Sequence, residues 1–139
     1  MAHDKGQADG RSPGESKRVL LVEDDEVSRK LAIILLKKSG FDVIIAENGK
    51  QAVGIYEKEP LDLILMDINM PEMDGFTATM KIREMEKQAN LHTHIIAMTA
   101  YAQKGDREKV LEFGMDDYIS KPINFKEFNE TIDKWVFKR

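Results

Sequence analysis

The chain has 139 residues, enough for one domain with an ordinary hydrophobic core. It contains no cysteine, which excludes disulfide bonds, zinc sites built on thiolates, and thiol catalysis. Its 21 basic and 25 acidic residues give a formal net charge of −4, unlike a basic nucleic-acid-binding domain, and no apolar run approaches the ~20 residues of a membrane span.

The first 17 residues differ in composition from the rest of the chain. They are rich in Gly, Ser, Pro, Asp and Lys and contain no apolar stretch of the kind found in a signal peptide. We therefore predict a disordered leader, or a tail left by cloning, over 1–17 and a single domain over 18–139. The plain interpretation is a cytoplasmic protein.

From Arg18 onward, short apolar runs alternate with amphipathic segments of helical length. Runs rich in Val, Ile and Leu are typical of parallel strands buried on both faces, and apolar residues three or four apart indicate helices. In chain order we predict strands over 19–22, 42–46, 61–66, 94–98 and 117–119. The first predicted helix covers 26–39, and the second extends from a cap at Asn48 to Pro60. The third contains the apolar stripe Ala78, Ile82, Met85 and Ala89. The fourth ends near Phe113–Gly114, and the fifth begins after Asn124.

The first predicted helix carries Val27, Leu31, Ile34 and Leu35 at helical spacing, which indicates an apolar face. Five strand–helix units joined by right-handed crossovers predict an α/β fold, a doubly wound parallel sheet with helices on both faces. We detect no repeat, coiled coil or second domain in the sequence.

Reactive polar residues follow four of the predicted strands. Asp24 and Asp25 come after the first, Asp67 after the third, Thr99 after the fourth and Lys121 after the fifth. In open α/β sheets, ligands bind beyond the carboxyl ends of the strands, so we expect three carboxylates, one hydroxyl and one ammonium to converge on one crevice. Any one of these acids alone would be typical of a helix cap, but independent caps have no reason to form a metal and phosphate site together.

Four segments, in this order and spacing, resemble the receiver domain of two-component response regulators. They read VLLVEDDE, LDLILMDINMPEMDG, IIAMTA and DDYISKPI, and the resemblance extends from Arg18 to Phe137. It implies the flavodoxin-like, CheY-like fold, in which five helices surround a five-stranded parallel sheet of strand order 2-1-3-4-5.

The resemblance also implies phosphoryl transfer from a partner's phosphohistidine to Asp67, in a two-component or phosphorelay system. A carboxylate that attacks phosphorus must overcome the repulsion between two anions, which a divalent cation lowers. Asp24, Asp25 and Asp67 would bind that cation, Mg²⁺ or Mn²⁺, and the resemblance adds the backbone carbonyl of Asn69 as a ligand. Lys121 would contact another phosphoryl oxygen.

Thr99 and Tyr118 would convert phosphorylation into a change of surface. A phosphoryl group brings negative charge and acceptor oxygens that can draw the Thr99 hydroxyl toward it. By resemblance, the ring of Tyr118 then moves inward, and the surface of the fourth helix, fifth strand and fifth helix changes for a downstream effector. The phosphodonor would be a sensor histidine kinase or a histidine phosphotransfer protein. The chain would then be a signalling domain that catalyses only its own phosphorylation and dephosphorylation, not an enzyme.

Three other functions fit parts of the pattern. A flavodoxin needs backbone amides and hydroxyls around a flavin phosphate in its first loop, which the acidic run 23–26 would repel. A phosphatase with an aspartate nucleophile needs a second aspartate two residues later as general acid, where this chain has Asn69. The third is a receiver-fold interaction module that works without phosphorylation, although Asp25, Asp67 and Lys121 are all present.

Three further polar residues are predicted to have no part in a site. Glu23 ends the first strand and is expected to face water rather than extend the acidic pocket. His92 and His94 lie two apart near the start of the fourth strand. Because no third ligand is expected nearby, a solvated pair is favoured over a metal site.

Overall fold

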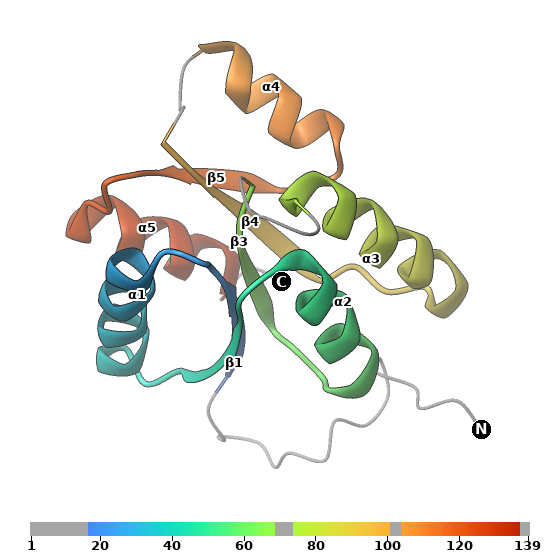
Figure 1. Ribbon diagram of the computed structural model, residues 1–139, viewed down its shortest axis with the longest axis horizontal. Helices are drawn as coiled ribbons and strands as arrows, with labels where there is room; N and C mark the ends of the chain where they lie inside the picture. The colour runs from blue at the N-terminus through green and yellow to red at the C-terminus, as the bar shows by residue number, and fades with distance from the viewer. Residues whose placement is uncertain (1–16, 69–73, 101–103, 137–139) are drawn as a thin grey trace.

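Five parallel strands form one sheet in the order β2-β1-β3-β4-β5, as predicted. The computed structural model describes residues 17–68, 74–100 and 104–136 (Figure 1). The strands are β1 (Arg18–Val22), β2 (Asp42–Ala46), β3 (Leu63–Asp67), β4 (His94–Thr99) and β5 (Asp117–Ser120). The helices are α1 (Glu26–Lys38), α2 (Gly49–Lys58), α3 (Gly75–Ala89), α4 (Lys104–Glu112) and α5 (Phe125–Val136). All ten predicted elements are present.

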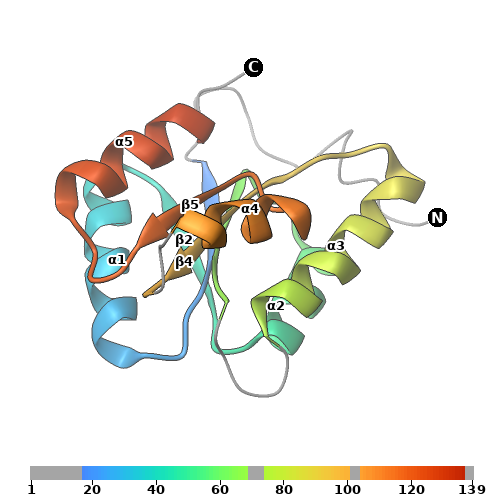
Figure 2. The ribbon, with the colours of Figure 1, turned by 90° about the horizontal axis from the view of Figure 1, so that it is seen from above.

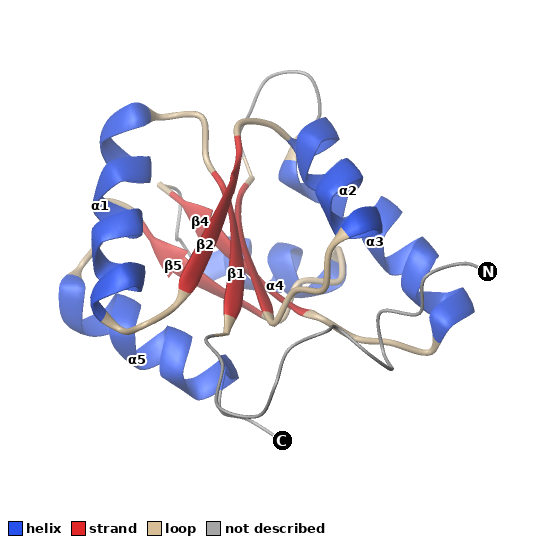
Figure 3. Ribbon diagram, turned by 90° about the horizontal axis from the view of Figure 1, so that it is seen from below, coloured by secondary structure: helices blue, strands red, loops and turns tan. Residues whose placement is uncertain are grey.

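The strands are buried on both faces because alternate side chains pack into two separate cores. Val19 and Leu21 of β1 belong to the core under α1 and α5, whereas Leu20 and Val22 belong to the core under α2, α3 and α4. Figures 2 and 3 show α1 and α5 on one side of the sheet and α2 and α3 on the other. This two-sided burial explains why the strands are continuous apolar runs rather than alternating ones.

The apolar stripe predicted on α1 does not face the sheet as a whole. Of its four residues, Leu35 is 7% exposed, whereas Val27, Leu31 and Ile34 are 76%, 39% and 57% exposed. The residues that α1 buries are Ala32, Leu35 and Leu36. The helix is apolar on more than one side, so its periodicity could not indicate which side meets the sheet. We call the exposed residues Val27, Leu31 and Ile34 the α1 patch.

The predicted leader is almost entirely beyond the structural description, which begins at Lys17. It therefore stays a prediction. Across the described ranges, no helix combines the length and the apolar character needed to cross a bilayer.

Candidate functional site

The polar residues at the strand ends lie at one edge of the sheet. Asp67 is the last residue of β3, Thr99 is the last residue of β4, and Lys121 directly follows β5. Lys121 Nζ lies 3.3 Å from Asp67 Oδ2, and the Lys121 backbone N–H donates to the Thr99 carbonyl at 2.8 Å. Asp67 and Thr99 are 4% and 0% exposed. A carboxylate and an ammonium thus meet in a place that is closed to most solvent.

Glu23 was expected to face water, and this prediction is wrong. Its side chain is fully buried, and Lys121 Nζ lies 2.7 Å from Glu23 Oε1. Glu23 Oε2 accepts a hydrogen bond from the Asp25 backbone N–H at 3.0 Å, and Arg29 donates to the Glu23 carbonyl at 3.2 Å. Glu23 is therefore part of the site. The signal for this was its position, directly after a strand that is fully buried from Val19 to Val22.

Asp25, expected among the metal-binding acids, lies outside the carboxylate cluster. Its Oδ2 accepts the Ser28 backbone N–H at 2.8 Å, so Asp25 is the N-cap of α1. Within the described residues, the carboxylates close enough to share one cation here are those of Glu23, Asp24 and Asp67, with ligand atoms within 4.8 Å of one another. Four consecutive acids follow β1, and an aspartate directly before a helix is more typical of a cap. Asn69, whose carbonyl was predicted as a ligand, is outside the described residues.

The site holds more negative than positive charge. Burial raises the pKa of the Glu23 carboxyl to about 7, and the adjacent Asp67 carboxyl adds to this rise. Burial also opposes the charge on Lys121, but Glu23 and Asp67 more than offset this effect and raise the pKa of its ammonium. Three carboxylates with one ammonium form an oxygen-rich, anionic donor set, which fits a hard divalent cation such as Mg²⁺.

Thr99 and Tyr118 lie on the same face of the sheet. In the parallel register, Tyr118 pairs with Ala97 of β4, two residues before Thr99, so the three side chains point the same way. Thr99 is buried, and Tyr118 is partly buried against the core under α2, α3 and α4. The hydroxyl at the site and the aromatic ring are therefore neighbours along one strand pair.

The start of α3 is pressed against the end of β3. A Cβ added to Gly75 would lie 2.6 Å from the Asp67 carbonyl oxygen, 2.8 Å from Ile68 Cα and 2.9 Å from Met66 Cγ. The first two contacts are with backbone atoms, which cannot give way as a flexible side chain can. Gly75 is therefore required for α3 to begin this close to the end of β3.

We expect Gly75→Ala to destabilise the fold by about 2 kcal/mol, because the new methyl group must displace backbone at the site. Urea unfolding followed by circular dichroism measures this loss. Gly54→Ala is the matched control, since a Cβ there meets nothing within 4 Å inside α2. It should raise stability by about 0.5–1 kcal/mol. Equal effects of the two substitutions would contradict the close approach.

Comparison with known sequences agrees with this fold. The sequence model described as the response regulator receiver domain matches residues 19–133. Hybrid signal transduction histidine kinase I of Dictyostelium discoideum is 47% identical over an alignment of 127 residues, and the match covers 88% of this chain and 7% of that protein. The polar-differentiation response regulator DivK of Brucella anthropi is 39% identical over 120 residues, or 86% of this chain and 96% of DivK. The chain belongs to the response regulator receiver domain family.

Solved structures give the same assignment. One match is to the co-crystal of the Saccharomyces cerevisiae histidine phosphotransfer protein Ypd1 with the receiver domain of its downstream response regulator Ssk1. It has a TM-score of 0.80 and 32% identity, covering 88% of this chain and 90% of that chain. A second match is to the receiver domain of sensor histidine kinase PA1611 from Pseudomonas aeruginosa, solved with magnesium in its active-site cleft. It has a TM-score of 0.79 and 36% identity, and it covers 88% of this chain and 99% of that chain.

This chain is thus a receiver domain of two-component or phosphorelay signalling, a signalling domain rather than a conventional enzyme. It spans only 7% and 6% of the length of two hybrid histidine kinases that it matches.

Proposed function

We propose that Asp67 accepts a phosphoryl group from a phosphohistidine on a partner protein. The observation that carries this proposal is the buried Asp67 carboxylate, held 3.3 Å from Lys121 Nζ and clustered with the carboxylates of Glu23 and Asp24. An Asp67 oxygen forms a bond to phosphorus while the bond from phosphorus to the donor imidazole nitrogen breaks. The product is an acyl phosphate on Asp67, and the imidazole leaves with the electron pair of the broken bond.

Glu23, Asp24 and Asp67 are the residues that would hold Mg²⁺ or Mn²⁺, together with the predicted carbonyl of Asn69. Bound there, the cation reduces the repulsion between the carboxylate and the phosphoryl oxygens. The magnesium in the cleft of the PA1611 receiver supports this choice of ion. The Lys121 ammonium, already 3.3 Å from Asp67, is a compact charge on a flexible stem and can turn from Glu23 to a phosphoryl oxygen.

Thr99 and Tyr118 are proposed as the residues that report phosphorylation. The Thr99 hydroxyl moves toward the new phosphoryl oxygens, which leaves space on the face of the sheet that Tyr118 shares. The ring of Tyr118 then packs inward, and the surface formed by α4, β5 and α5 changes for a downstream effector. Two packings of one ring provide the two-state element that such a switch needs.

The α1 patch is proposed as the docking surface for the phosphodonor. Val27, Leu31 and Ile34 are exposed, lie at positions i, i+4 and i+7, and begin two residues after the acidic cap Asp25. An apolar stripe with this spacing fits a helix of a partner better than it fits water. A sensor histidine kinase or a histidine phosphotransfer protein would be that partner. The co-crystal of the Ssk1 receiver with Ypd1 supports this class of partner.

We expect the double substitution Val27→Ala/Leu31→Ala to slow phosphotransfer from a phosphorylated histidine phosphotransfer protein by about tenfold or more, because it truncates two of the three apolar side chains of the patch. Labelling by acetyl phosphate should stay unchanged, because this small donor needs no docking surface. The control Lys37→Ala/Lys38→Ala alters the far end of the same helix and should affect neither reaction. Slower phosphorylation by both donors would show that the patch supports the chemical step or the fold, and not docking of the partner.

The proposed function is tested by the intact mass of the chain after incubation with acetyl phosphate and magnesium. One added phosphoryl group, absent after metal chelation and removed by hydroxylamine, is the expected result. No added mass, with magnesium shown to bind, would favour an interaction module that works without phosphorylation. Continuous release of phosphate from simple phosphate esters would favour an aspartate-nucleophile phosphatase.

A further inference from the structure

A second cluster of metal-ligating side chains lies at the edge of the sheet opposite to Asp67. It combines His92 and His94, at the start of β4, with Asp116 from the loop between α4 and β5. The prediction that the two histidines have no third ligand nearby is wrong. The Asp116 backbone N–H donates to the Ile95 carbonyl at 2.8 Å, and Asp116 Oδ2 accepts the Ile95 N–H at 2.8 Å. These two bonds fix the carboxylate beside the histidines.

The distances within this cluster are close to those of a three-ligand metal site. His92 Nε2 lies 2.8 Å from Asp116 Oδ1, His94 Nδ1 lies 3.7 Å from Asp116 Oδ2, and the three ligand atoms are within 4.8 Å of one another. Tetrahedral zinc, with bonds of about 2.0–2.1 Å, requires ligand atoms about 3.3 Å apart. Small rotations of the side chains would therefore bring all three onto one ion.

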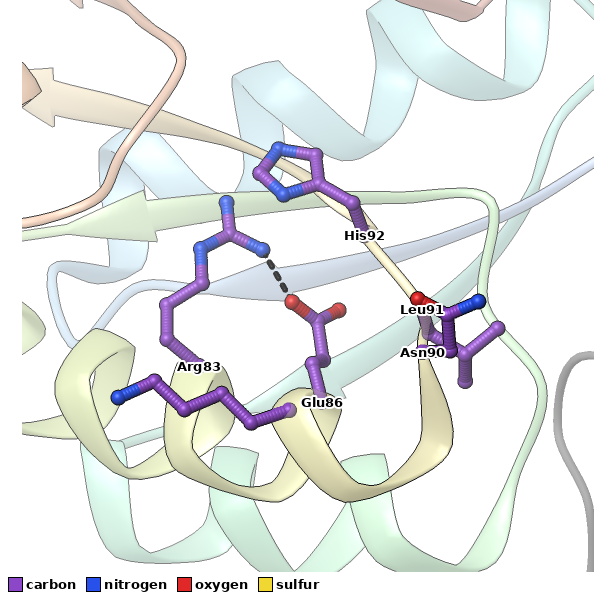
Figure 4. A pocket seen from close by; sticks show the side chains of 6 residues that line it. Arg83, Glu86, Asn90, Leu91 and His92 are labelled. Atoms are coloured by element: carbon purple, nitrogen blue, oxygen red, sulfur yellow. Dashed lines mark hydrogen bonds and ion pairs between the residues drawn. The ribbon is translucent and has the colours of Figure 1, made fainter.

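Neighbouring groups orient Asp116 as the outer partners of a metal ligand do. Arg83 donates to Asp116 Oδ2 at 3.0 Å, on the oxygen that also accepts the Ile95 N–H. Oδ1 is thereby left on the side of His92. The charge of Arg83 is shared with Glu86, 2.6 Å away, an ion pair that Figure 4 shows below His92. Two carboxylates against one guanidinium leave the cluster negative, which favours a cation.

His94 has a buried ring nitrogen that makes no hydrogen bond within the described part of the chain. Among the described residues, Nδ1 of His94 has no hydrogen-bond partner. A buried polar atom in this state costs free energy that a bound ion would recover.

Solvent can reach the cluster from two sides. A hollow of about 270 Å³ and another of about 210 Å³ share His92 and Leu91 in their walls. His94 and Asp62 also line the second hollow. Water, or a side chain from another molecule, could therefore complete the fourth position of a tetrahedral ion.

We propose that His92, His94 and Asp116 bind one Zn²⁺ ion, with the fourth coordination position open. Two imidazole nitrogens and one carboxylate suit zinc and disfavour magnesium, which prefers oxygen ligands. The site is separate from the carboxylate cluster at Asp67. The ion would link the start of β4 to the loop that precedes β5, and so join two strands that the proposed switch must adjust relative to each other.

Trp135 provides a direct reporter for this site. It is the only tryptophan of the chain, and its ring centroid lies 4.8 Å from that of His94. Zinc is titrated into the metal-free protein in the presence of excess magnesium, which occupies the carboxylate cluster. Trp135 fluorescence, native mass and thermal unfolding are then recorded. We expect one zinc per chain at micromolar concentrations, a change in Trp135 emission and a higher melting temperature.

Variants separate this site from other zinc-binding groups. His92→Gln and His94→Gln should each weaken zinc binding by about 10- to 100-fold. His92 is half exposed, so its replacement should leave the fold intact. His3→Gln, which alters the only other histidine of the sequence, and Asp67→Asn should leave zinc binding unchanged. Absence of one-to-one binding to the wild type, or wild-type zinc affinity in His92→Gln and His94→Gln, would overturn the proposal.

Discussion

The Asp67→Asn variant is expected to gain no phosphoryl group from acetyl phosphate or from a phosphorylated histidine phosphotransfer protein. The amide keeps the shape of the carboxylate but offers no anionic oxygen to phosphorus. Asp67 is 4% exposed and is the acid that Lys121 approaches at the end of β3. Removing the nucleophile should therefore abolish labelling rather than slow it, and intact mass measures this directly.

The same variant should remain folded. Asp67 lies beside the buried Glu23, whose carboxyl pKa is raised by burial and by Asp67. Replacing one of two adjacent acids by a neutral amide lowers their mutual repulsion, so the metal-free variant should melt no lower than the wild type. Asp24→Asn is the comparison, because this exposed acid belongs to the cluster without being the proposed acceptor. It should slow labelling without abolishing it. Phosphorylation of Asp67→Asn at the wild-type level would show that another residue is the acceptor.

The second large effect is expected for Glu23→Gln, and it depends on pH. The carboxyl pKa of Glu23 rises from 4.5 to about 7 in the folded chain. Its proton is thus held more tightly in the folded state than in the unfolded state. In the absence of metal, binding of this proton therefore increases the free energy of unfolding. The increase is fully present below the pKa of Glu23 in the unfolded chain and is lost as pH rises through about 7. For one proton, the free energy of unfolding cannot change with pH by more than about 1.4 kcal/mol per pH unit.

Glu23→Gln should remove this slope, so that the metal-free variant is more stable than the wild type at pH 8. Urea unfolding in a chelator between pH 5 and pH 8 measures the difference. A divalent cation must displace the Glu23 proton, so magnesium affinity of the wild type should increase as pH rises through about 7. In Glu23→Gln the affinity should be weaker and nearly independent of pH over that interval. Parallel pH profiles of the two proteins would show that Glu23 is not the titrating acid.

Most of the fold could be predicted from the sequence because the strands are buried on both faces. Such strands form continuous apolar runs, and Val19, Leu63 and Ile96 from three of them share one core. The position of the site followed from the same topology, since Asp67 and Thr99 end adjacent parallel strands. These predictions needed only local patterns and the rule that parallel strands end at one edge.

The errors in the predicted site arose where several adjacent residues are chemically alike. Four consecutive acids follow β1, and whether Glu23 or Asp25 enters the site depends on where the strand stops and the helix begins. The structure places Asp25 at the helix cap and Glu23 beneath Lys121. Asp116 could not be paired with His92 from local patterns, because the two residues meet only through the crossover between β4 and β5.

Lys121 contacts both the carboxylates of the site and the strand pair that carries Thr99 and Tyr118. Its backbone N–H is bonded to the carbonyl of Thr99, while its ammonium faces Glu23 and Asp67. One residue therefore anchors the β4–β5 pair with its main chain and balances the charge of β1 and β3 with its side chain. This residue thus ties the ammonium beside the proposed acceptor to the strand pair that carries Thr99 and Tyr118. If Asp67 is the acceptor and Thr99 the reporter, as proposed, a signal needs no longer chain of residues between them, because Lys121 contacts both.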